Sequence, residues 1–136
     1  MMRIRSTWSV ACGGLFTLIG VLTSPAMLEA QAEALPDSVT PAMVAEGATL
    51  FQGAGICAAC HGPDGTGATG PDLTDDEWLH GDGSYESIVE RILAGVPADS
   101  SKSGIPMLPK GGSQLTDAQV RMVAAHVWNL RLQQAP

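Results

Sequence analysis

The amino-acid sequence predicts an all-α domain of about four helices. Apolar residues recur at helical spacing in three separate stretches, and helix-capping residues stand in front of them. No stretch shows the alternation of a convincing strand, and the 136 residues contain no internal repeat. A hydrophobic content of 45% with 15% charged residues favours a folded chain over a disordered one. We therefore expect one helical domain.

Residues 1–32 have the layout of a secretory signal peptide. Two arginines precede an apolar run at 8–22, and Ala30-Gln31-Ala32 offers a small-x-small cleavage site. The apolar run is short for a membrane-spanning helix, which needs about 20 residues. We expect export with cleavage after Ala32, and an uncleaved membrane anchor is the alternative. A polar linker over 33–40, the folded domain over 41–132 and a tail over 133–136 complete the predicted organisation.

The first helix is predicted to begin at Pro41, because Thr40 suits the N-cap and proline suits the first helical position. Its end is expected at the glycine-rich residues 53–55. Gly47 on its apolar face suggests a close helix crossing, since glycine lets another backbone approach. The residues expected on this face are Val44, Gly47, Ala48 and Phe51.

The sequence Cys57-Ala58-Ala59-Cys60-His61 follows at once. Two cysteines separated by two residues and followed by histidine form the signature of c-type haem attachment. Each thiol adds across one vinyl group of the porphyrin, and a neutral imidazole is a good axial ligand for iron. Cys57 and Cys60 are therefore the candidate attachment residues, and His61 is the candidate iron ligand.

Two other chemistries use the same cysteine spacing. A thioredoxin-like redox pair would stand near a βαβ pattern, and no β-rich run flanks Cys57. A closed zinc site would need further cysteine or histidine ligands. The remaining cysteine, Cys12, lies far away in the N-terminal apolar run. Haem attachment is thus the preferred interpretation, and an export signal agrees with it.

Residues 62–70 contain four glycines and one proline, so they predict a loop lying close over a flat ligand rather than a helix or strand. No phosphate-binding GxxxxGK[ST] pattern is present. Thr74 and Glu77 then resemble a capping box, with Leu73 and Trp78 as its hydrophobic staple. These residues predict a short helix over 75–80, in whose first turn the acidic residues favour the helix dipole.

A third helix is expected from Ser84 to Gly95, with an apolar stripe of Tyr85, Ile88, Val89, Ile92 and Leu93. Residues 96–113 follow as a long loop, and a loop of that length in a small domain is usually functional. The last helix is predicted over 116–132, because Thr116 and Gln119 form a capping box. Its apolar face comprises Val120, Val123, Ala124, Val127 and Trp128.

The formal charge of −7 argues against nucleic acid and anionic membranes as partners. An acidic surface would favour partners with a basic docking rim, or it would serve solubility alone. Membrane contact is expected only through an uncleaved N-terminal segment or through a membrane partner. No nucleophile–base pair or acid–base constellation points to an enzyme.

Taken together, these motifs resemble those of class I c-type cytochromes, most closely small bacterial monohaem cytochromes c and the haem domains of cbb3-type oxidase subunits. The resemblance covers residues 41–132. Its motifs are Gly47-x-x-x-Phe51, Cys57-Ala58-Ala59-Cys60-His61-Gly62, Gly70-Pro71-Asp72-Leu73, Pro106-Met107-Leu108-Pro109 and Ala124-Ala125-His126-Val127-Trp128. His126 departs from the family, which often has an aromatic residue there.

The resemblance implies a small cytochrome c fold around one covalently bound haem c. It implies that His61 is the proximal ligand, that Met107 is the distal ligand, and that the Pro71 carbonyl accepts from the free nitrogen of His61. Leu73 would pack on the haem face. Among other possible donors, Met43 and Met122 fall on helices beside apolar residues, where methionine is usually core filler, and His80 and His126 are isolated.

The implied function is one-electron transfer between redox partners in the periplasm, as part of a respiratory chain. Two alternatives to a free carrier stay open. One is a permanent cytochrome subunit of a membrane oxidase or periplasmic dehydrogenase. The other is a haem sensor or peroxidase-like enzyme, in which Met107 would dissociate from the iron.

Overall fold

The computed structural model describes residues 35–133. The expected signal peptide and almost all of the expected tail therefore lie outside the described residues. The fold is all-α, as the sequence predicts, and no helix of the described part is long and apolar enough to cross a membrane. Its helices, in chain order, are α2 (Pro41–Gln52), α3 (Ala58–His61), α4 (Tyr85–Ala94), the short 3₁₀ helix η1 (Pro109–Gly112) and α5 (Asp117–Leu132).

Three predicted helix starts are confirmed by their caps. Thr40 and Ser84 accept hydrogen bonds from the third residue of α2 and of α4, through the amides of Met43 and Ser87. At α5 the capping box is complete, because Thr116 accepts from the Gln119 amide while the Gln119 side chain accepts from the Thr116 amide. These contacts satisfy amide groups that have no partner inside the helix.

The predicted helix over 75–80 is wrong. Thr74 does not cap a helix, because its hydroxyl and its amide both donate to Asp72 Oδ1 at 2.7 Å. The Glu77 amide likewise donates to Asp75 Oδ1 at 3.0 Å. Threonine and aspartate side chains that bond to nearby backbone compete with helix formation. The segment is therefore an ordered, non-helical loop, and the fourth α-helix is instead the single turn α3, which carries the cysteine–histidine motif.

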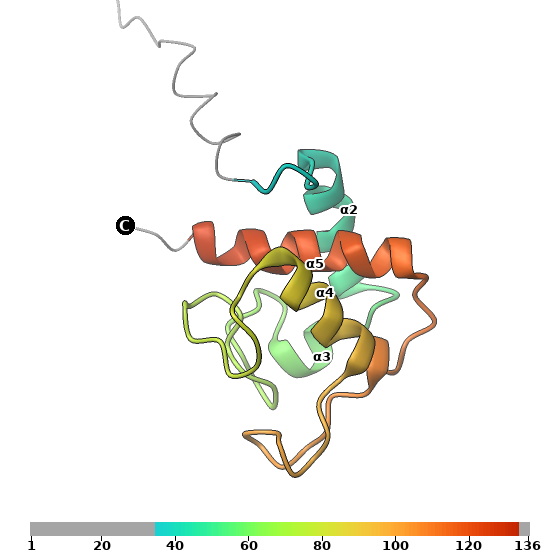
Figure 1. Ribbon diagram of the computed structural model, residues 1–136. Helices are drawn as coiled ribbons and strands as arrows, with labels where there is room; N and C mark the ends of the chain where they lie inside the picture. Colours follow the sequence, from blue (N-terminus) through green and yellow to red (C-terminus); the bar gives the residue numbers. More distant parts are fainter. Residues whose placement is uncertain (1–34, 134–136) are drawn as a thin grey trace, which may run out of the picture.

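Helix α5 lies across α2 and α4, and the α2–α5 crossing is as close as Gly47 predicts (Figure 1). A Cβ atom added at Gly47 would overlap the Met122 carbonyl and would lie 3.0 Å from His126 Cβ. The two backbones touch at this point because glycine has no side chain.

The core lies between these helices and is built from their predicted apolar faces. Phe51 of α2 and Val120 and Val123 of α5 are completely enclosed. Met43, Leu73, Trp78 and Met107 are half-buried and pack against this core. The buried cluster comprises Val39, Leu50, Phe51, Tyr85, Ile88, Val89, Ile92, Leu115, Val120, Val123, Ala124, Ala125, Val127 and Trp128.

The segment between α4 and α5 extends on the side of the molecule opposite α5 (Figure 1). Although the sequence predicts only a loop here, two features fix its backbone. Val96 and Met107 exchange both backbone hydrogen bonds, at 2.8 and 2.9 Å, as an isolated antiparallel bridge. Residues 109–112 then form η1. Met107 is thereby held beside the end of α4.

Candidate functional site

A mostly apolar cleft of about 280 Å³ opens beside α3 and α4. Its walls come from segments far apart in the sequence: α3, the loop after it, α4, the α4–α5 loop and one face of α5. All the site residues that the sequence analysis names line this one cleft, namely Cys57, Cys60, His61, Pro71, Leu73 and Met107.

His61 is buried and its orientation is fixed by one hydrogen bond. Its Nδ1 atom lies 2.9 Å from the Pro71 carbonyl oxygen. A carbonyl can only accept, so Nδ1 carries the proton and Nε2 keeps its lone pair. A histidine held in this way presents a neutral nitrogen donor whose basicity is raised by the carbonyl. The contact that the resemblance implies between His61 and Pro71 is therefore present.

The glycine-rich loop is packed against the His61 side chain. A Cβ atom at Gly70 would lie 3.0 Å from both Cε1 and Nδ1 of the imidazole. The Gly67 amide donates to the His61 carbonyl and the Gly70 amide to the Cys60 carbonyl, each at 2.8 Å. The loop thus wraps the turn that carries the motif, and Gly70 is needed because a side chain would displace the ring.

The two cysteines lie at unequal depth, Cys57 as the N-cap residue of α3 and Cys60 within it. Cys57 is half-buried and Cys60 is exposed, and neither forms a disulfide within the described residues. Burial raises the pKa of the Cys57 thiol. Ile56, directly before Cys57, has φ of 59°, a left-handed conformation that is rare for a β-branched residue. The turn is therefore entered through a strained backbone position, which is typical of functional sites.

Met107 is half-buried in the cleft wall, and its thioether is a soft donor suited to iron. The other candidate donors are placed differently. Met43 and Met122 pack against the core and do not line the cleft, and His126 stacks edge-on against Phe51 with ring centroids 5.3 Å apart. His80 lines the cleft from the non-helical loop.

Two buried donors in the cleft wall were not predicted from the sequence. Trp78 Nε1 and Arg91 Nε are enclosed and have no hydrogen-bond partner among the described residues. Trp78 packs on the backbone of Gly83, and the Arg91 side chain donates to the Gly95 carbonyl at 3.2 Å. An unpaired buried donor is costly, so these two atoms suit a ligand that carries acidic groups. The sequence did not indicate these buried donors, because a tryptophan in a loop and an arginine on a helix belong to no recognisable motif.

The cleft therefore fits a large apolar group with acidic substituents and a metal centre. Its apolar walls, the paired thiols, a neutral imidazole, a thioether and two unpaired buried donors are what haem c requires. Fold and site together define a small helical protein of the type that holds haem covalently.

The family comparison agrees with this class. The family model described as Cytochrome c matches residues 44–131, and the chain belongs to this family. It is accordingly a c-type cytochrome of the electron-transfer type with covalently bound haem c, and its cysteines fit the CxxCH motif. The sequence prediction of family, fold class and cofactor is confirmed.

The chain is also similar to curated proteins described as cbb3-type cytochrome c oxidase subunits. It is 40% identical over 92 residues to CcoP of Cereibacter sphaeroides, covering 65% of this chain and 28% of the relative. It is 37% identical over 89 residues to FixPc of Rhizobium leguminosarum bv. viciae, covering 64% and 30%. It is 40% identical over 96 residues to FixP of Sinorhizobium medicae, covering 68% and 31%.

The chain thus spans less than a third of the length of these relatives. No solved structure gives a significant match.

Proposed function

We propose that this chain is an exported monohaem cytochrome that carries single electrons between redox partners in the periplasm. Residues 1–32 would be the signal peptide, 33–40 a linker, 41–132 the haem domain and 133–136 a tail. The observation that carries the proposal is the convergence of His61 and Met107 on one apolar cleft, with His61 Nδ1 held by the Pro71 carbonyl at 2.9 Å.

In this proposal the residues of the cleft have separate roles. Cys57 and Cys60 bind the haem covalently, and His61 and Met107 are the axial ligands. Haem iron supplies a site that gains and loses one electron. The hydrogen bond to Pro71 fixes the orientation of the His61 ring, and the bridge to Val96 fixes the backbone of Met107. Leu73 contributes apolar wall, which excludes water from the cofactor.

The acidic groups of the cofactor would meet Trp78 Nε1 and Arg91 Nε. These donors are the only buried side-chain polar atoms of the described residues that lack a partner. A carboxylate placed against either atom would supply the missing acceptor, and beside Arg91 the guanidinium would also neutralise its charge. This arrangement fixes the orientation of a flat ligand within an otherwise apolar cleft.

Exchange of the Met107 thioether tests the proposal. Met107→Leu keeps the side-chain volume and removes the sulfur, so the midpoint potential of the purified haem protein should fall and ferrous iron should bind carbon monoxide readily. Met122→Leu is the matched control, because Met122 packs against the core outside the cleft. An unchanged potential and unchanged ligand binding in Met107→Leu would show that the distal ligand is another residue.

A permanent subunit of a membrane oxidase is the second candidate, because the similar curated proteins are described as oxidase subunits. The two candidates differ in what the native protein is bound to. A free carrier is recovered from periplasmic extract as a monomeric haem protein, whereas a subunit is recovered with an oxidase after detergent extraction of membranes.

A further inference from the structure

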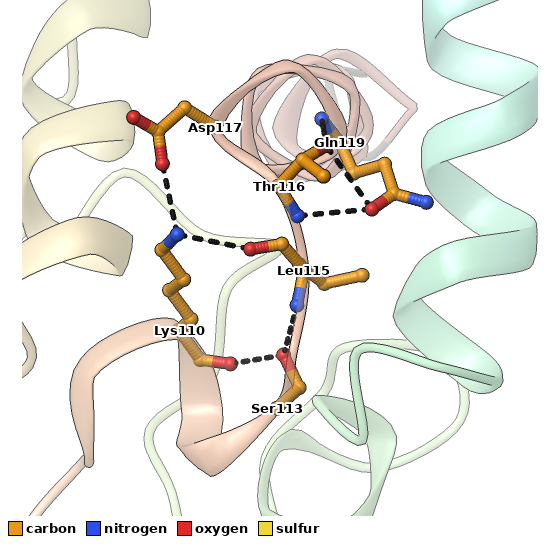
Figure 2. A network of polar contacts seen from close by, with 6 residues as sticks. All are labelled: Lys110, Ser113, Leu115, Thr116, Asp117 and Gln119. Atoms are coloured by element: carbon orange, nitrogen blue, oxygen red, sulfur yellow. Dashed lines mark hydrogen bonds and ion pairs between the residues drawn. The ribbon is translucent and has the colours of Figure 1, made fainter.

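Lys110 is tied to the start of α5 by its side chain. Its Nζ atom donates to the Leu115 carbonyl at 2.9 Å and pairs with Asp117 Oδ1 at 2.8 Å (Figure 2). The Ser113 hydroxyl donates back to the Lys110 carbonyl at 2.6 Å, so both the side chain and the backbone of Lys110 are fixed. Leu115 is itself buried. We call these contacts of Lys110 with Ser113, Leu115 and Asp117 the Lys110 clamp.

The clamp lies close to Met107 along the chain. Leu108, the next residue, accepts a hydrogen bond from the Gly111 amide at 2.8 Å. The backbone of Met107 is itself held by the bridge to Val96 at the end of α4. The clamp supplies a second attachment, on the C-terminal side of Met107, to the start of α5.

The short helix η1 also packs against the segment before Cys57. A Cβ atom at Gly111 would lie 3.1 Å from the Gly55 carbonyl, and one at Gly55 would lie 3.3 Å from Leu115 Cδ1. The backbone of η1 is therefore packed against the chain that enters the cysteine turn. The clamp connects the Met107 loop both to α5 and to this entrance.

The backbone of Lys110 indicates that its side chain is required there. Its φ of 55° and ψ of 27° lie in the left-handed region, where glycine or asparagine would be at ease and lysine is strained. Gly111 and Gly112, which follow, also have positive φ. A lysine in a run where glycine is favoured stores strain that its contacts must offset.

We propose that Lys110 is a positioning residue, whose clamp to α5 keeps the Met107 loop closed over the cleft and so keeps the thioether at the iron. The inference rests on the proposed function, because it takes Met107 as the distal ligand. Lys110 itself contacts neither ligand nor cofactor; it acts through the loop. Loss of the clamp should raise the frequency with which the loop opens and an external ligand takes the place of sulfur.

The test measures how fast and how completely imidazole displaces the thioether from the ferric iron of the full haem-loaded chain. Lys110→Asn suits the left-handed backbone and removes the long cationic side chain. We expect displacement by imidazole to rise about fivefold to tenfold, which corresponds to the loss of one net hydrogen bond together with a surface ion pair. Asp117→Asn should give a smaller rise, because the bond from Lys110 to the Leu115 carbonyl remains.

Arg121→Gln is the matched control. Arg121 lies on α5 outside the cleft wall and forms an exposed ion pair with Glu86 at 3.1 Å, so the substitution removes one ion pair and the same charge. Displacement in this variant should equal that of the wild type. Urea unfolding of each variant measures its global free energy of unfolding and so separates loop opening from global destabilisation. If the clamp controls the loop, displacement by imidazole should change by more than the change in that free energy accounts for.

Two outcomes would overturn the inference and can be told apart. If the wild-type ferric spectrum shows thioether ligation but Lys110→Asn and Asp117→Asn match Arg121→Gln, the clamp does not control the loop. If the wild type shows no thioether ligation, the proposed role of Met107 fails, and the inference fails with it.

Discussion

Two ring nitrogens in this cleft, on His61 and Trp78, differ in whether the polypeptide supplies their hydrogen-bond partner. His61 has its Nδ1 proton satisfied by the Pro71 carbonyl, which leaves a neutral donor atom for a metal. Trp78 has only an N–H to offer, and that N–H is buried without a partner among the described residues. The first arrangement is complete in the polypeptide alone, whereas the proposed function would complete the second with an acceptor on the cofactor.

Removal of the Trp78 N–H tests this reading. In Trp78→Phe the haem should still attach, but the cofactor carboxylate loses a donor to its charged form, so the carboxyl pKa should rise. We expect the inflection in the plot of midpoint potential against pH to move to higher pH. Trp128→Phe is the control, because Trp128 lies in the core and not in the cleft wall. Equal pH profiles for both variants would place the acidic group elsewhere.

At the scale of elements, the α2–α5 crossing supports the proximal side of the site. α2 leads directly into the cysteine turn, and α5 supplies the helix on which it is supported. The contact depends on one residue without a side chain, Gly47, and on one edge-on pair of rings, Phe51 and His126. The imidazole of His126 thus supplies a ring contact at the crossing.

Gly47→Ala should destabilise the protein although alanine is the better helix former. In a free helix the change would be favourable by about 1 kcal/mol. Here the new Cβ overlaps the Met122 carbonyl, and such overpacking costs about 1–3 kcal/mol. Urea unfolding measures the balance, with Ala45→Gly on the exposed face of α2 to calibrate helix propensity. A Gly47→Ala protein more stable than wild type would contradict the close crossing.

His126 should make stability depend on pH. Burial lowers its pKa below the usual 6.5, so the folded state prefers the neutral ring. Its contribution is complete above the unfolded-state pKa of about 6.5 and is lost as pH falls toward the lower folded-state value. His126→Phe should reduce the difference in urea midpoint between pH 7.5 and pH 5. An undiminished difference would assign the pH dependence to other titratable groups.

At the scale of the whole molecule, the cleft is a joint product of all the helices and the loops between them. Its mouth carries exposed apolar side chains, with Ile56, Ile105 and Leu108 each more than half exposed. The chain as a whole is acidic, with a formal charge of −7. A partner that approaches it meets a negative field first and an apolar rim at contact.

Electron exchange should therefore respond to salt according to the charge of the partner. With a lysine-rich redox protein the second-order rate should fall as ionic strength rises from 10 to 300 mM, on the order of tenfold for steered association. With an acidic partner of similar potential the rate should rise instead. Stopped-flow mixing measures both. Rates independent of salt for both partners would mean that the acidic surface serves solubility alone.

The helices and their ends were largely predictable because their signals are local. The caps at Thr40, Ser84 and Thr116 act within one turn, and the apolar spacing follows from helix geometry. The prediction over 75–80 was wrong for a local reason too. Asp72 competes for the Thr74 hydroxyl, and a capping pattern read from types and spacing does not reveal which acceptor wins.

The sequence by itself determined the family, the all-α fold and the cofactor, because the haem-attachment motif occupies five consecutive residues and the helices are marked by local spacing and caps. Tertiary structure alone decided what the cleft offers besides those residues. Trp78 and Arg91 become a pair of unpaired buried donors, and Lys110 becomes a clamp, only once distant segments pack together. Such roles depend on burial and on approach through space, and neither is recorded in the spacing of residues along the chain.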